Sequence, residues 1–118
     1  MKTETFNGGC HCGKVRFKVT TNLSSVITCN CSMCSKAGTM LTFVPAEQFT
    51  LEKGEDALSN YQFNKKVIDH LFCKHCGIKA FGRGAGADGK KMVAVNVRCL
   101  DTFDELDLEI TPVDGKSS

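Results

Sequence analysis

The clearest pattern in the chain is an alternation of apolar and charged residues over 14–20 (KVRFKVT). Val15, Phe17 and Val19 fall on one side of an extended backbone and the cationic residues fall on the other, which predicts a half-buried strand. Similar short runs predict further strands at 26–29, 41–44, 49–52, 57–63, 67–72, 78–82, 91–97 and 106–111. The pattern therefore predicts a mainly β fold with little helix.

The sequence predicts only short helical segments, together with several turns. One helix is expected over 31–36, one turn of helix from Pro45 and another after Asp101. Turns are predicted at 8–9, 53–54 and 64–66, and a frayed tail at 114–118. The glycine-rich run 82–89 lacks the Lys-Ser/Thr ending of a phosphate-binding loop, so a mobile hairpin loop is expected there.

Length and charge narrow the class of protein. A chain of 118 residues predicts a single domain over 1–118. The net charge of +2 is far from the basic balance of a nucleic-acid or membrane-surface binder. The chain contains neither a membrane-spanning apolar run nor the apolar core of a signal peptide, so we expect a cytoplasmic protein.

Cysteine is the unusual component, because seven of the eight cysteines fall into three tight groups. In a reducing cytosol such thiols are metal ligands or catalytic groups, whereas an exported protein would form four disulfides. The missing export signal favours metal binding. The groups are Cys10 and Cys12, then Cys29, Cys31 and Cys34, and finally Cys73 and Cys76.

The first and last groups together predict a structural zinc site. FCKHCGIKAF is typical of a zinc knuckle, in which Gly77 lets backbone N–H groups turn toward sulfur. GGCHCGKV offers a second pair in a glycine-bounded turn. Such a site has a net charge of about −2, so lysines are expected nearby. The predicted ligands are Cys10, Cys12, Cys73 and Cys76, with Lys14, Lys74 and Lys79 as candidate neighbours.

The middle group supplies three thiolates, Cys29, Cys31 and Cys34, and no evident fourth ligand. Three protein ligands and an open position characterise a catalytic zinc. The alternative is a second structural zinc completed by Cys99 or by a histidine. Otherwise Cys99 is a small buried residue at a strand end.

The histidines and scattered cations give weaker signals. His11 and His75 each lie between two ligand cysteines, so their rings are expected to point away from the metal. His70 is either a partly buried histidine or a pocket base. Five cationic residues are candidates to bind the carboxylate group of a substrate. Otherwise they are solvated surface residues. These are Arg83, Arg98, Lys36, Lys65 and Lys66.

From residue 8 to about residue 101, the motifs GGCHCGKVRF, CNCSMCSKAGT, FCKHCGIKAF and VNVRCLD follow in this order. In this the chain resembles the glutathione-dependent formaldehyde-activating enzyme family, which includes centromere protein V. The resemblance implies a β-tent, in which several small antiparallel sheets surround the zinc sites. It also implies that Cys10, Cys12, Cys73 and Cys76 hold the structural zinc, and that Cys29, Cys31 and Cys34 hold the zinc proposed to act in catalysis.

The family's named member joins formaldehyde to glutathione to give S-hydroxymethylglutathione, and is classed in reverse as a carbon–sulfur lyase. The resemblance therefore implies a zinc-dependent lyase with two zincs per chain. Because the second site has three thiolates and an exchangeable ligand, its metal is expected to be labile. The partners of this lyase would be a small thiol and an aldehyde, with neither nucleic acid nor membrane. The metal would bind the thiol as thiolate or polarise the aldehyde oxygen. The alternative function is a structural zinc module, or a glutathione carrier without catalysis.

Overall fold

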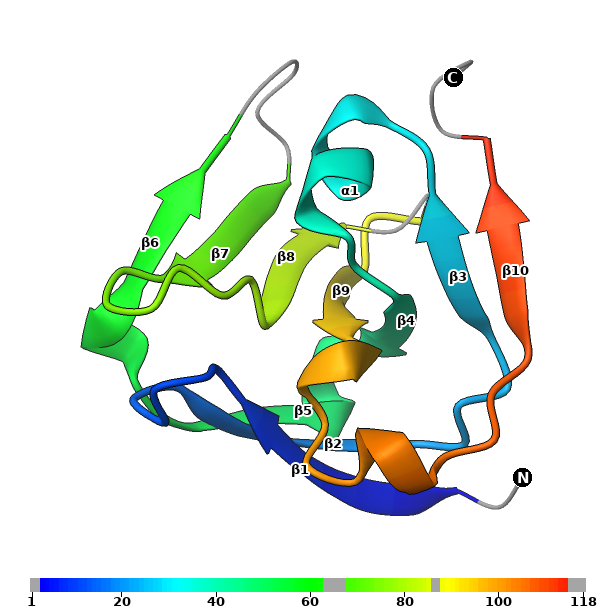
Figure 1. The fold of residues 1–118 in the computed structure, drawn as a ribbon, viewed down its shortest axis with the longest axis horizontal. Coiled ribbons are helices and arrows are strands. Elements are labelled where there is room, and N and C mark those ends of the chain that lie inside the picture. The colour runs from blue at the N-terminus through cyan, green and yellow to red at the C-terminus, as the bar shows by residue number, and fades with distance from the viewer. Residues whose placement is uncertain (1–2, 63–67, 86–87, 115–118) are drawn as a thin grey trace.

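The computed structural model describes residues 3–62, 68–85 and 88–114. Within this part of the chain, ten strands form two sheets, and the one α-helix is α1 (Ser32–Ala37) (Figure 1). The predicted mainly β fold is therefore confirmed. No helix in the described ranges is long and apolar enough to cross a bilayer.

The smaller sheet has three antiparallel strands in the order β1 (Glu4–Gly9), β2 (Arg16–Thr21) and β5 (Phe49–Lys53). The larger sheet has seven strands in the order β10-β3-β4-β9-β8-β7-β6. All its pairs are antiparallel except β3 and β10, which run parallel at one edge. Its strands are β3 (Val26–Cys29), β4 (Leu41–Pro45), β6 (Leu58–Tyr61), β7 (Asp69–Cys73), β8 (Phe81–Ala85), β9 (Lys91–Asn96) and β10 (Ile110–Val113).

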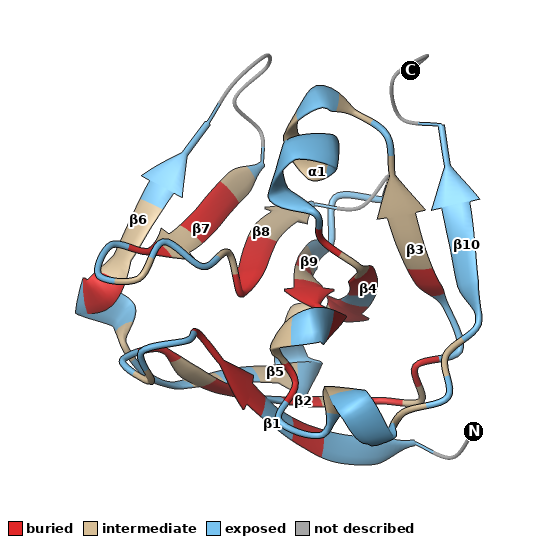
Figure 2. Ribbon diagram, viewed as in Figure 1, coloured by how far each residue is buried: buried red, intermediate tan, exposed pale blue. Residues whose placement is uncertain are grey.

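The hydrophobic core lies between the two sheets (Figure 2). The strand predicted from alternation is β2, where Phe17 and Val19 are fully buried, as is Val15 just before it. Phe49 of β5 packs between Phe17 and Phe81, with ring centroids 5.2 Å and 4.7 Å away. These aromatic contacts join β2 and β5 of the small sheet to β8 of the large one.

Two local predictions are wrong for reasons of packing. The turn expected at Gly8 and Gly9 is the end of β1, where a Cβ at Gly8 would lie 2.7 Å from the Cys99 carbonyl oxygen. Glycine is needed there for close approach rather than for a turn. The strand expected at 106–111 begins only at Ile110, because Leu106 and Leu108 pack on the core without a strand partner.

Two elements that follow the predicted knuckle have bounds that differ from the prediction. The strand expected at 78–82 is β8, which starts at Phe81, because the knuckle turn extends to the bond from the Cys73 N–H to the Ile78 carbonyl. At its other end β8 continues to Ala85, so it occupies the first part of the segment 82–89 in which a loop was expected. Residues 63–67, 86–87 and 115–118, on which other turn, loop and tail predictions fall, lie outside the described residues.

The short helical segments lie close to where they were expected. Cys31 caps α1, and its sulfur accepts a hydrogen bond from the Cys34 N–H at 3.4 Å. Gly38 ends α1 with a φ of 67°, in the left-handed region that glycine favours. The turns after Pro45 and Asp101 are the 3₁₀ segments Ala46–Gln48 and Phe103–Glu105. None of these segments organises the fold, but α1 and its cap hold two of the predicted ligands, Cys31 and Cys34.

Candidate metal centres

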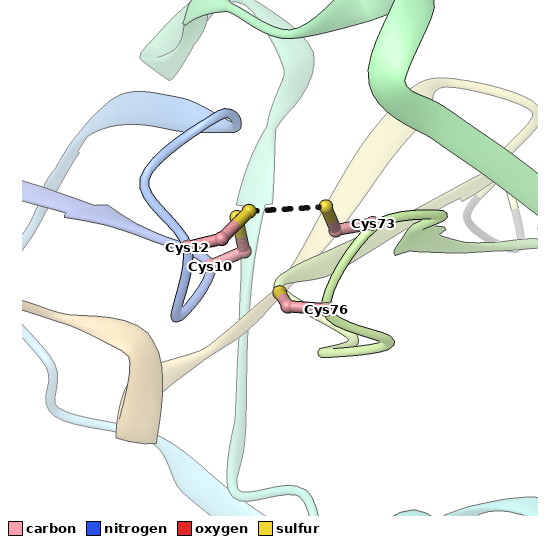
Figure 3. Close-up of side chains that lie close together, drawn as sticks. All are labelled: Cys10, Cys12, Cys73 and Cys76. Carbon is pink, nitrogen blue, oxygen red and sulfur yellow. Dashed lines mark hydrogen bonds between the residues drawn. The ribbon is translucent and has the colours of Figure 1, made fainter.

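Four of the predicted ligands, Cys10, Cys12, Cys73 and Cys76, converge at one point (Figure 3). Their sulfur atoms all lie within 4.8 Å of one another, and the Cys12 sulfur is 3.6 Å from those of Cys10 and Cys73. A tetrahedral zinc with Zn–S bonds of about 2.3 Å requires sulfurs about 3.8 Å apart. This four-cysteine cluster therefore fits zinc.

Local backbone turns aim the sulfurs of this cluster. The first pair follows β1, and the Val15 N–H donates to the Cys10 sulfur at 3.4 Å. The second pair begins at the end of β7, where the His75 N–H donates to the Cys73 sulfur at 3.4 Å. Gly77 closes the turn with a φ of 80°, and its N–H bonds to the Cys73 carbonyl at 2.7 Å. N–H groups directed at sulfur favour the thiolate form that a metal needs.

The thiol pKa values in this cluster diverge. Burial acts to raise the pKa of Cys76, but backbone hydrogen bonds and neighbouring thiols lower it to about 6. A backbone hydrogen bond acts to lower the pKa of Cys12, but burial and its three cysteine neighbours raise it to about 11. Thiolates this close repel one another, and a divalent cation among them removes that repulsion.

The remaining predicted ligands form a second group, the cysteine trio of Cys29, Cys31 and Cys34. Cys29 ends β3, while Cys31 and Cys34 lie at the start and middle of α1. Their sulfurs also lie within 4.8 Å of one another, so this group fits zinc too. Burial raises the pKa of Cys34 to about 12, with the neighbouring thiols acting in the same direction.

Among the described residues, no fourth Cys, His, Asp or Glu joins the trio. The remaining thirteen positions contain none of these residue types. Cys99 lies outside both groups, and burial together with the charges of Cys10 and Cys76 raises its pKa to about 11. In this structure, therefore, Cys99 does not complete the trio.

Lys79 interacts electrostatically with the trio. Burial lowers the pKa of its ammonium group, and the charges of Cys34, Cys31 and Cys99 oppose that shift. Lys14 and Lys74 instead line a hollow of about 400 Å³ with Lys53 and His75. The three lysines expected near the structural site thus divide between two places.

The other predicted side chains have structural partners or lie at the surface. His11 and His75 are exposed, as their positions between ligands predicted. His70 is buried on β7. Arg83 stacks over Phe81 and pairs with Glu55 at 3.6 Å, and Arg98 stacks over Phe103. Lys36 lies in the exposed last turn of α1, and Lys65 and Lys66 lie outside the described residues.

Comparison with known proteins gives matches to a family model and to solved structures. A family model described as glutathione-dependent formaldehyde-activating enzyme matches residues 5–113. A crystal structure of a Rhodobacter sphaeroides protein superposes with a TM-score of 0.77 and 25% sequence identity. The superposition covers 91% of this chain and 99% of the other.

Proposed function

Because the chain belongs to the glutathione-dependent formaldehyde-activating enzyme family, we propose that it joins a thiol to a small aldehyde, and splits the adduct, at the trio of Cys29, Cys31 and Cys34. In the splitting direction this is carbon–sulfur lyase chemistry. The proposed thiol and aldehyde are glutathione and formaldehyde, which the family description names. The proposed cofactors are one zinc at each cysteine group.

The observation that carries the proposal is the difference between the two groups. The four-cysteine cluster offers four sulfurs, which complete a tetrahedron, whereas the trio offers three. A closed site of this kind stabilises the fold, and a site with three protein ligands has room for a reactant. The chemistry is therefore assigned to the trio.

The reaction is a simple addition. A bond forms between the thiol sulfur and the carbonyl carbon, the carbonyl π electrons move to oxygen, and the thiol proton ends on that oxygen. Zinc, when bound, supplies a Lewis acid that favours a thiolate or polarises a carbonyl. The reverse reaction breaks the same carbon–sulfur bond and returns the proton to sulfur.

Neighbouring groups orient one sulfur of the trio and offset its negative charge. The Cys34 N–H holds the Cys31 sulfur at the start of α1, which fixes the direction of that ligand. The ammonium group of Lys79 offsets the negative charge that three thiolates and an incoming thiolate place on this face. Lys79 thereby favours binding of an anionic sulfur.

We do not propose nucleic acid as a partner. On the cationic face of β2, Arg16 pairs with Asp101, and Lys18 pairs with Glu52 at 3.5 Å. Few positive charges on this face are left for phosphates.

Exchange spectroscopy by NMR tests the proposal. With labelled formaldehyde and glutathione, wild-type protein should accelerate exchange between the free thiol and S-hydroxymethylglutathione. Cys31→Ser should remain folded, bind about one zinc instead of about two, and lose the acceleration. Cys76→Ser should fold poorly because it opens the structural site.

Cys99→Ser is the matched control, since it removes a thiol that lies outside both groups. It should keep both zincs and the full rate. Loss of the second zinc in this variant would mean that Cys99 closes the site, and the structural zinc module would then be the better explanation. Unchanged acceleration by Cys31→Ser would refute the catalytic role of the trio.

A further inference from the structure

An apolar groove lies on the large sheet, on the face turned away from the core between the sheets. Its volume is about 300 Å³, close to the lower limit of small-molecule sites. Phe43 and Ile68, two of its lining side chains, are 51% and 47% exposed. The lining is mainly apolar and includes Phe43, Ile68, Gly82, Gly84, Met92 and Ala94.

The register of the sheet explains why there is space here. Phe43 of β4 pairs with Ala94 of β9, which pairs with Gly82 of β8. Paired residues present their side chains to the same face, so this row places two very small residues beside one large aromatic. Gly84, two residues along β8, extends the gap on that face.

The two glycines have different reasons to be there. A Cβ at Gly82 would approach the Asp69 carbonyl oxygen to 2.9 Å, so the backbone of β7 requires glycine at that position. A Cβ at Gly84 would meet only the Ile68 side chain, at an ordinary 3.5 Å, and the Gly84 φ is not in the left-handed region. Neither backbone conformation nor packing therefore requires glycine at position 84. What its missing side chain does is leave the groove open.

The groove and the cysteine trio share one face of the sheet. Ile27 of β3 pairs with Leu41 of the antiparallel strand β4, and Cys29 and Phe43 each lie two residues beyond that pair, in opposite directions along the sheet. Side chains two residues apart point to the same side of a sheet. Lys79 links the two places, because its Nζ lies 4.0 Å from the Cβ position at Gly82 and its charge acts on Cys31 and Cys34.

We propose that this groove binds the hydrocarbon part of the reacting molecule, so that the chain accepts a small thiol or adduct carrying an aromatic or branched aliphatic group. The inference rests on the proposed function, since the trio supplies the reacting end. The groove offers such a group apolar contact over most of its surface, and its lining includes one charged side chain, that of Arg83. The occupant is a small molecule because the volume suits one ring or a short chain.

The first test uses cobalt-loaded protein and two thiols, phenylmethanethiol and 2-mercaptoethanol, followed by thiolate-to-metal absorption. Burial of the ring should make phenylmethanethiol bind about tenfold tighter. Gly84→Leu should abolish that preference by filling the groove and leave 2-mercaptoethanol unchanged. Thr111→Leu, which adds similar bulk to an exposed position on β10, is the control and should change neither thiol.

The second test needs no reaction at the metal. Phenylmethanol, which has no thiol, should shift the methyl resonances of Met92 and Ala94 in zinc-loaded wild-type protein but not in Gly84→Leu. Unshifted resonances in the wild type, or equal binding of the two thiols, would overturn the inference. If phenylmethanol binds as described while neither thiol reaches the metal, the groove is an apolar site and the proposed function is what fails.

Discussion

The sulfur atoms of Cys12 and Cys73 lie 3.6 Å apart, although 61 positions separate the two residues in the chain. One residue follows β1 of the small sheet and the other ends β7 of the large sheet. A metal shared by these thiols therefore fastens the two sheets together at a point beside the aromatic core. Much of the stability of the fold should depend on that link.

Replacement of Cys73 by serine should remove this link. Cys73 is fully buried, so the variant loses a metal ligand and leaves a hydroxyl in the core. We expect the free energy of unfolding to fall by about 4 kcal/mol or more. Urea unfolding of zinc-loaded protein measures the change. Cys34→Ser, in the peripheral helix α1, should lose less than half as much, and equal losses in the two variants would contradict the assignment of Cys73 to the structural site.

His70 should titrate below the ordinary histidine range. Burial lowers its pKa below 6.5, the nearby Lys79 ammonium lowers it further, and Asp69 opposes the shift. An NMR titration of the imidazole should therefore have its midpoint below pH 6.5, and Lys79→Met should raise that midpoint. A midpoint at or above 6.5 in the wild type would refute the stated surroundings of His70.

The lowered pKa of His70 also sets the sign of a stability effect. At pH values just below 6.5 the unfolded chain binds a proton at this residue more readily than the folded chain does. The contribution of His70 to stability is thus complete above pH 6.5 and declines as the pH falls toward the folded-state pKa. His70→Gln should show a smaller loss of unfolding free energy than the wild type over that interval.

The Arg16 guanidinium binds both carboxylate oxygens of Asp101, which joins β2 to the segment after β9. Both side chains are partly exposed, so solvent limits the gain, and Asp101→Asn should cost about 0.5 kcal/mol at neutral pH. Arg16 lowers the pKa of Asp101 below 3.8, so this contribution disappears as the pH falls through that lowered value. Thermal unfolding at pH 7 and pH 2 checks both statements: the variant should melt below the wild type at pH 7 and level with it at pH 2.

Much of the fold was predictable because single residues carried the signal. The alternation of Val15, Phe17 and Val19 marks β2, and the cysteine spacing marks both groups whose sulfurs converge. The turn predicted at Gly8 and Gly9 was wrong. The sequence does not distinguish a glycine that allows close approach of another segment from a glycine in a turn. The prediction from local pattern was good where the pattern itself determines burial.

What sequence could not supply are relationships between strands distant in the chain. Lys79 is three residues from Cys76, which suggested the structural site, but its charge acts on Cys34 and Cys31 across the sheet. The groove is likewise invisible in the sequence, because Phe43, Ala94 and Gly82 become neighbours only through strand register. The sequence GRGA likewise does not indicate which of its two glycines the backbone of β7 requires.

The most direct test of the open position at the trio is a titration of cobalt-substituted protein with glutathione, followed by thiolate-to-metal absorption. We predict an additional sulfur-to-cobalt band that saturates with about one glutathione per chain and is missing in Cys31→Ser. A spectrum that glutathione leaves unchanged, in protein carrying cobalt at both cysteine groups, would contradict the claim that the trio admits a fourth ligand.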